Sequence, residues 1–297
     1  MSDLCSMRSR AVGEPIAGTA VGETAVWIVL EHRGSWGAKA VAESNLPEAV
    51  KARLSAWEDE IPGARVQLAR RRGRVDGPLR FWLGVSDLGA SRLCAYTLGA
   101  VEDLLQLDLA AQVQALRAGE TIAGAAMLTE PLVLVCTNGR RDVCCAKLGA
   151  PMAQALSEQG GLEVWHTTHL GGHRFAATLR QLPEGICYGR LEPPEAPALA
   201  EAIRGRRIYR LDRLRGRTAL SEAAQAAEAV WREQSGRLEL DALARVEEAA
   251  EGGTTVVRLH DSDGSTHEVR LTRRDLGQSA PASCGKEPAA VKAWLPA

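Results

Sequence analysis

The chain has few aromatic side chains, almost no net charge and no long apolar run. Two phenylalanines and three tyrosines occur among its 297 residues, so it lacks the aromatic platform and paired carboxylates typical of a glycosidase. A formal net charge of −1, without aromatic residues interleaved among basic ones, argues against a nucleic-acid partner. The most apolar stretch, residues 122–136, is interrupted by Glu130 and Pro131. We therefore expect neither a membrane span nor a membrane partner.

An evenly spaced cysteine framework is also missing. Seven cysteines are scattered along the chain, whereas secreted disulfide scaffolds are short and dense in cysteine. The first residues, Met-Ser-Asp-Leu-Cys-Ser-Met-Arg, lack the apolar core of a signal peptide. These features predict a cytoplasmic protein with reduced thiols and no leader.

What the chain does contain is an internal repeat of apolar patterns in the order β-α-β-β-β-α. The first copy comprises segments 27–31, 46–57, 66–68, 79–85, 93–98 and 101–116. The second copy comprises segments 132–135, 151–159, 162–165, 174–179, 185–191 and 196–204. This order predicts an α/β fold of two tandem thioredoxin-like halves.

The repeat and the tail divide the chain into three expected parts. Residues 1–125 form a degenerate thioredoxin-like domain without ligands, residues 126–235 a second such domain with the candidate ligands, and residues 236–297 a small appendage. In the appendage, segments 255–260 and 267–271 alternate apolar and polar residues, which predicts a β-hairpin. Segment 204–217 carries seven arginines, which predict a solvated basic face able to dock an acidic reductase or donor protein.

Two short blocks carry the candidate chemistry, one with Cys136, Cys144 and Cys145 and the other with His169 and His173. Thiolate and imidazole together suit zinc or an iron–sulfur cluster, whereas magnesium and calcium prefer oxygen ligands. The first cysteine follows a predicted strand, where open α/β sheets usually place their ligands. A Gly-Gly pair separates the two histidines, which predicts a tight loop in place of a helix.

The residue types leave alternatives open. Cys144 is a reserve ligand for Cys145, and His166 is a reserve for His169, although His166 is first expected to be a partly buried, hydrogen-bonded residue. A Cys2His2 zinc site uses the same residues. A thiol–disulfide oxidoreductase ranks last, because no Cys-x-x-Cys occurs and adjacent cysteines form only a strained disulfide. Structural thiols are expected at Cys5, Cys94, Cys187 and Cys284.

The motifs Cys-Thr-Asn and Cys-Ala-x-x-Gly, with Pro183-Glu-Gly-Ile-Cys-Tyr-Gly189 further on, resemble the thioredoxin-like [2Fe-2S] ferredoxins. The motif His-x-Gly-Gly-His-Arg-Phe-Ala resembles their sucrase/ferredoxin-like branch. The resemblance is most specific over residues 132–191 and weaker over most of the chain. It implies a [2Fe-2S] cluster with one iron on Cys136 and Cys145 and the other on His169 and His173. In the all-cysteine relatives, cysteines stand at the positions of His169 and His173.

The resemblance implies a one-electron carrier or redox sensor with a redox partner protein, more than an enzyme with a substrate of its own. Replacing two thiolates by two neutral imidazoles removes two negative charges, so the reduction potential is expected to rise as in Rieske centres. An imidazole ligand that loses a proton on oxidation would make the potential depend on pH. The donor, the acceptor and the oligomeric state do not follow from the sequence.

Overall fold

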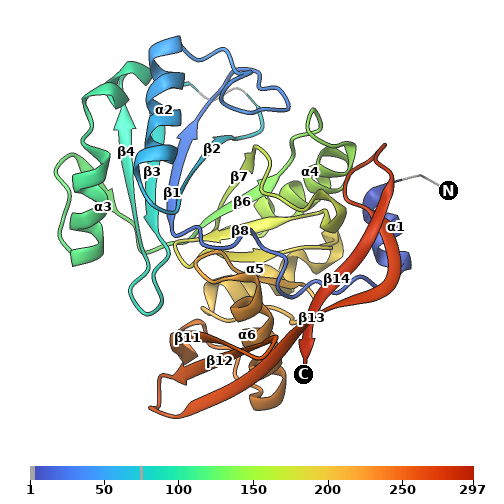
Figure 1. The fold of residues 1–297 in the computed structure, drawn as a ribbon. Coiled ribbons are helices and arrows are strands. Elements are labelled where there is room, and N and C mark those ends of the chain that lie inside the picture. The colour runs from blue at the N-terminus through green and yellow to red at the C-terminus, as the bar shows by residue number, and fades with distance from the viewer. Residues whose placement is uncertain (1–3, 74–75) are drawn as a thin grey trace.

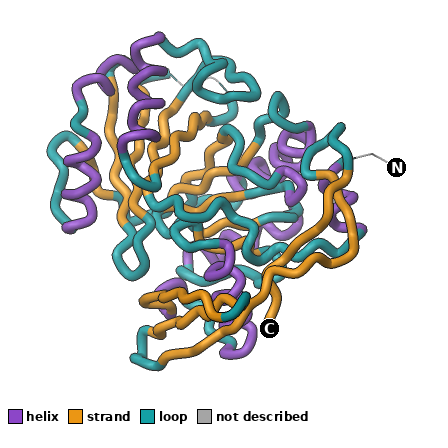
Figure 2. Tube along the Cα trace, viewed as in Figure 1, coloured by secondary structure: helices purple, strands orange, loops and turns teal. Residues whose placement is uncertain are grey.

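The computed structural model describes residues 4–73 and 76–297 and confirms the α/β class (Figure 1). A ten-stranded mixed sheet runs through the body of the molecule, with helices on its faces (Figure 2). Its strand order is β10-β9-β8-β6-β7-β2-β1-β3-β4-β5. A separate four-stranded antiparallel sheet lies at the C-terminal end of the chain.

The large sheet consists of two halves with the same strand order and senses. The first half comprises β1 (Val26–Glu31), β2 (Ala64–Arg70), β3 (Leu79–Val85), β4 (Arg92–Leu98) and β5 (Ala125–Met127). The second comprises β6 (Leu132–Cys136), β7 (Glu163–Thr167), β8 (Leu179–Leu182), β9 (Ile186–Tyr188) and β10 (Leu214–Arg217). In each half the first strand is parallel to the second and antiparallel to the third. The halves join where β2 pairs antiparallel with β7.

Helices cover each half with apolar side chains. In the first half α2 (Glu48–Glu60) contributes Val50, Leu54 and Trp57 to the core, and η1 (Val101–Gln106) and α3 (Leu109–Ala118) follow β4. In the second half α4 (Val143–Ser157) and α5 (Ala196–Arg204) pack over β6 and β8. The central strands β1 and β6 are buried along their whole length, which explains their continuous apolar sequences.

Two predicted elements of the second half were wrong in their bounds. The strand predicted over 174–179 begins only at Leu179, because Gly171 and Gly172 adopt left-handed φ angles of 86° and 67° and lead into the short 3-10 helix η2 (His173–Phe175). Helix α4 begins at Val143 and not at Pro151, because the Asp142 side chain caps it by accepting a hydrogen bond from the backbone N–H of Cys144. Both adjacent cysteines therefore lie in the first turn of this helix.

The predicted C-terminal hairpin is confirmed by the pairing of β12 (Thr254–Asp261) with β13 (Thr266–Pro281). The small sheet has two strands besides the predicted hairpin, β11 (Leu243–Glu251) and β14 (Pro288–Pro296), and α6 (Glu222–Ser235) packs on it. Figure 1 shows β13 and β14 extending as a long arm toward α1 (Cys5–Ala11) and α4. Within residues 4–73 and 76–297, no helix is both long and apolar enough to cross a bilayer.

The basic segment 204–217 is built into the fold through ion pairs. Arg215 and Arg217 are buried, so the predicted solvated face is wrong for these two residues. The pairs join Arg206 to Glu184, Arg207 to Glu239, Arg213 to Glu195 and Arg217 to Glu228. Much of the positive charge of this segment is therefore neutralised within the chain.

Candidate metal centre

The parallel strands β6 and β7 bring the two sequence blocks to the same edge of the sheet. Cys136 is the last residue of β6 and is in register with Thr167, the last residue of β7. His169 follows two residues later. Because parallel strands end at one edge, the side chains that follow them lie close together.

Cys145 reaches the same place from the first turn of α4. The helix approaches β6 closely at Gly149, where a Cβ atom would collide with the carbonyl oxygen of Cys136. This close approach explains the glycine of the Cys-Ala-x-x-Gly motif, because any side chain would push the helix away from the strand. The N-terminus of α4 also places the positive end of the helix dipole beside the thiol.

Three of the predicted ligands converge. The Nδ1 atom of His169 lies 3.9 Å from the Cys136 Sγ and 3.8 Å from the Cys145 Sγ. All three ligand atoms lie within 4.8 Å of one another. Both cysteines are buried against Leu170, whereas His169 is half-buried. The group is therefore shielded on the sulfur side and accessible on the imidazole side.

The fourth predicted ligand, His173, lies beside this group. Its ring centroid is 4.9 Å from that of His169, and its Nε2 lies 3.7 Å from the Asp142 Oδ2. Its Nδ1 is buried and has no hydrogen-bond partner among the described residues. A buried ring nitrogen without a partner is costly unless something else binds it. This arrangement leaves the His173 Nδ1 free to bind a metal.

The pKa values follow from these contacts. The hydrogen bond with Cys145 lowers the pKa of the Cys136 thiol well below its usual range, against the effect of burial, and His169 lowers it further. The same hydrogen bond, followed by burial, raises the pKa of Cys145. Burial lowers the pKa of His173, with an opposing effect from the Asp142 carboxylate. The Cys136 sulfur and the His173 imidazole are thus favoured in the ionisation states that bind metals.

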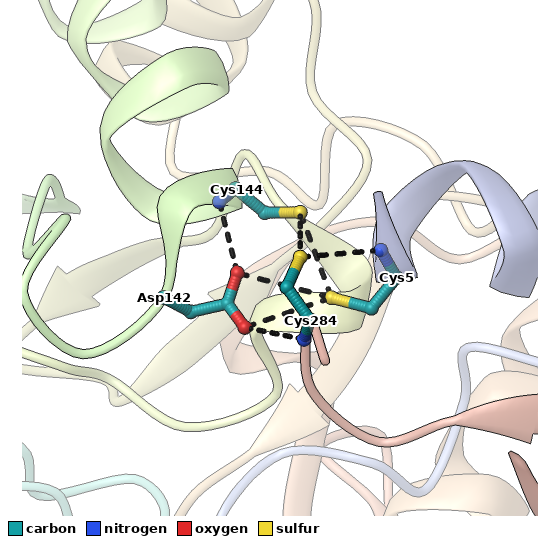
Figure 3. Close-up of side chains that lie close together, drawn as sticks. All are labelled: Cys5, Asp142, Cys144 and Cys284. Carbon is teal, nitrogen blue, oxygen red and sulfur yellow. Dashed lines mark hydrogen bonds between the residues drawn. The ribbon is translucent and has the colours of Figure 1, made fainter. Parts of the chain in front are cut away.

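The two reserve ligands lie elsewhere. The Cys144 Sγ belongs to a second group, in which it contacts the thiols of Cys5 and Cys284 (Figure 3). His166 projects toward a cavity of about 980 Å³ that it shares with several arginines. Cys145, and not Cys144, faces Cys136 and His169.

Sequence reasoning missed two residues that position the site. Asp142 caps α4 and approaches His173. Arg215 is buried on β10 and donates a hydrogen bond of 2.9 Å to the carbonyl oxygen of Gly171, in the loop between the two histidines. An aspartate just before the helical cysteines was a signal for a cap, but no pattern in the sequence links Arg215 to a loop so far away in the chain.

Comparison with known proteins places this site in a family. The sequence profile described as sucrase/ferredoxin-like matches residues 17–216, about two thirds of the chain. The chain belongs to the sucrase/ferredoxin-like family. This confirms the resemblance seen in the Cys-Ala-x-x-Gly and His-x-Gly-Gly-His motifs, both of which lie inside the matched region.

The sucrase/ferredoxin-like chain is also similar to a curated protein, the altered inheritance of mitochondria protein 32 of Meyerozyma guilliermondii. The two are 29% identical over 100 residues, which cover 30% of this chain and 35% of the relative. The match thus spans about a third of the length of that protein. No solved structure matches the chain. Family membership and the Cys/His groups together fit a thioredoxin-like ferredoxin with a metal-binding site.

Proposed function

We propose that this protein is a one-electron carrier or redox sensor whose [2Fe-2S] cluster is held by Cys136, Cys145, His169 and His173. The observation that carries the proposal is the convergence of the two Sγ atoms and the His169 Nδ1 within 4.8 Å. Two thiolates and two imidazoles are a ligand set known for [2Fe-2S] centres. When bound, such a cluster exchanges single electrons, and imidazole ligands raise its reduction potential.

The surroundings of His173 support its assignment as the fourth ligand. Histidines that bind metals usually donate their other ring N–H to a carboxylate or carbonyl oxygen, which fixes the ring. The His173 Nε2 faces the Asp142 carboxylate at 3.7 Å, while its buried Nδ1 has no partner among the described residues. Asp142 would therefore orient this imidazole, and Arg215 would hold the loop that carries both histidines.

The accessible side of the site suggests where a redox partner protein docks. His169 borders a surface cavity of about 280 Å³ whose lining also contains Lys39, Arg65, Arg141 and a single carboxylate, Glu58. Three cations against one anion favour an acidic partner surface, which would be steered toward the half-buried imidazole. Oxidation of the reduced protein by anionic ferricyanide should therefore slow with added salt and in Lys39→Glu, but not in Lys286→Glu, at the tip of the C-terminal arm.

The test is a visible absorption and EPR spectrum of anaerobically purified protein, with iron, sulfide and zinc quantified on the same sample. We expect a red-brown protein with about two irons and two sulfides per chain and a Rieske-like signal on reduction. The signal should be altered or lost in His169→Cys and His173→Cys. Cys94→Ala is the matched control, because Cys94 is buried in β4 outside both Cys-containing groups.

Other results would overturn the proposal. A protein without iron after cluster reconstitution, holding zinc that Cys136→Ser removes, would assign these residues to the Cys2His2 zinc class. A metal-free protein that cycles a Cys136–Cys145 disulfide would instead be a thiol–disulfide oxidoreductase. Both are colourless, so the spectrum separates them from the iron–sulfur protein.

A further inference from the structure

A second group of thiols lies next to the first and brings residues near both ends of the chain to the N-terminus of α4. Cys5 begins helix α1, Cys144 lies in the first turn of α4, and Cys284 lies in the loop 282–287 at the tip of the β13–β14 arm. Figure 3 shows the three side chains converging on the Asp142 carboxylate. Four ligand atoms from these residues lie within 4.8 Å of one another.

The separations match a metal site better than a disulfide. The Cys144 Sγ lies 3.5 Å from the Cys5 Sγ and 3.4 Å from the Cys284 Sγ. Both Asp142 oxygens lie 3.9 Å from the Cys5 Sγ. A tetrahedral zinc ion with Zn–S bonds of about 2.3 Å places its sulfurs about 3.8 Å apart, whereas a disulfide bond is about 2.05 Å long. All three sulfurs can share one ion, but a disulfide would leave one thiol out.

Polar groups around the sulfurs resemble the outer shell of a metal–thiolate site. The Ser6 hydroxyl donates to the Cys144 Sγ at 3.3 Å, and the backbone N–H of Cys5 donates to the Cys284 Sγ at 3.4 Å. The Asp142 carboxylate is fixed by the backbone N–H groups of Cys144 and Cys284, at 2.9 and 2.8 Å, and by the Ser283 hydroxyl at 2.9 Å. Outer hydrogen bonds of this kind orient ligands before the metal arrives.

We propose that Cys5, Cys144 and Cys284, with Asp142 as the fourth ligand, form a structural zinc site separate from the Cys136–Cys145–His169 group. Three thiolates suit zinc, and a carboxylate oxygen can serve as the fourth ligand of a tetrahedral site, so these four residues can fill the coordination sphere of a structural zinc ion without a water ligand. On binding, each thiol releases its proton to solvent, so no oxidant or reductant is needed. Cys144 would then be a zinc ligand, while Cys145 remains a ligand of the first site.

The zinc site would fasten two distant segments, helix α1 and the loop 282–287, to the N-terminus of α4. Residues 5, 144 and 284 come from opposite ends and the middle of the chain, so their joint ligation closes two long loops. Since Cys144 precedes Cys145, the ion also fixes the helical turn that presents Cys145 to Cys136. The C-terminal appendage would then be a support for the first site rather than an independent module.

The test measures metal in the full chain with the first site disabled. Cys136→Ser protein is purified anaerobically, and its zinc is quantified and then replaced by Co²⁺, whose thiolate charge-transfer bands report sulfur ligands. We expect about one zinc per chain and cobalt bands, both lost when Cys284→Ser or Cys5→Ser is added. Cys94→Ala in the same background should keep both. Cys284 is only partly buried, so its substitution tests ligation without opening the core.

Two results would overturn the proposal. One is zinc content and cobalt bands that are the same with and without Cys284→Ser. The other is a disulfide among Cys5, Cys144 and Cys284 in peptides mapped from anaerobic, unreduced protein. Protection of these three thiols from alkylation, lost on adding a chelator, gives a second readout if a variant folds poorly. Because the first site is disabled throughout, none of these results depends on the iron–sulfur proposal.

Discussion

The imidazole Nε2 of His173 lies 3.7 Å from the Oδ2 atom of Asp142. This contact links the Cys136–Cys145–His169 group to the group that contains Cys5, Cys144 and Cys284. The same oxygen accepts hydrogen bonds from the backbone N–H of Cys284 and from the Ser283 hydroxyl. Asp142 therefore borders both groups while it caps helix α4. A change at this carboxylate should reach both of them.

Replacing Asp142 by asparagine should lower the pKa of His173. Burial lowers the pKa of His173 and the Asp142 carboxylate raises it, so removing this negative charge takes away the larger of the two effects that oppose burial, the other being a backbone hydrogen bond with Ala282. Asparagine still caps the helix, which separates the charge from the cap. The measurement is an NMR titration of the ring protons in metal-free protein. Asp108→Asn, at the cap of α3, is the matched control, and an unchanged His173 pKa in Asp142→Asn would contradict the expectation.

Asp142→Ala should lower the free energy of unfolding by about 1–2 kcal/mol at neutral pH, because the helix loses its cap. Burial opposes ionisation of this carboxyl, but hydrogen bonds from the backbone N–H groups of Cys284 and Cys144 and from Ser283 lower its pKa to about 2. An acid whose pKa is lowered on folding stabilises the folded state at pH values above its pKa in the unfolded chain. This stabilisation is lost as the pH falls toward its pKa in the folded state. The difference in the free energy of unfolding between wild type and Asp142→Ala should therefore shrink as the pH falls from about 4 to about 2. Denaturant titration of the metal-free proteins measures it. A difference that stays constant over this range would exclude the carboxylate as its source.

The reduction potential should fall with rising pH in alkaline solution. If His169 or His173 binds an iron, its remaining ring proton is lost more easily from the oxidised state. The slope should approach about 59 mV per pH unit where one proton accompanies one electron. Potentiometry followed by visible absorption checks this, and the double variant His169→Cys/His173→Cys should show a flat profile. A flat profile in the wild-type protein would rule out proton-coupled behaviour.

Gly149→Ala should destabilise the protein, although alanine normally favours helices. A Cβ at this position would collide with the carbonyl oxygen of Cys136, so helix α4 must move away from β6. We expect a loss of about 1–3 kcal/mol in the free energy of unfolding, together with weaker metal retention. Ser157→Ala, at the exposed end of the same helix, should change the stability by less than about 0.5 kcal/mol. Equal stability of the two variants would contradict the close approach.

Arg215→Lys should loosen the loop that carries the two histidines. Lysine lacks the planar fork with which Arg215 binds the carbonyl oxygens of Gly171 and Thr19. We expect faster loss of the visible absorbance in the presence of a chelator. Arg217→Lys is the control, because Arg217 is also buried on β10 but pairs with Glu228 away from the loop. Equal rates for both variants would show that Arg215 acts only on stability.

The repeat and the loop positions of several candidate ligands could be predicted from the sequence by itself. Apolar runs such as 132–135 identified the buried strands, because a strand covered on both faces has no polar alternation. The position of Cys136 directly after an apolar run predicted that it would lie at the carboxyl end of a strand, and Cys136 is indeed the last residue of β6. The glycine pair before His173 predicted a tight loop, and Gly171 and Gly172 indeed have left-handed backbone angles.

Tertiary structure alone decided which of the two adjacent cysteines faces Cys136 and that Cys5 and Cys284 contact Cys144. Cys144 and Cys145 are neighbours in a helix, so their side chains point about 100° apart, and only the packing of α4 on β6 settles that Cys145 faces Cys136. Cys5 and Cys284 looked like isolated thiols because 279 residues separate them. No local pattern reports contacts between such distant segments, since they depend on how the β13–β14 arm reaches α1 and the N-terminus of α4.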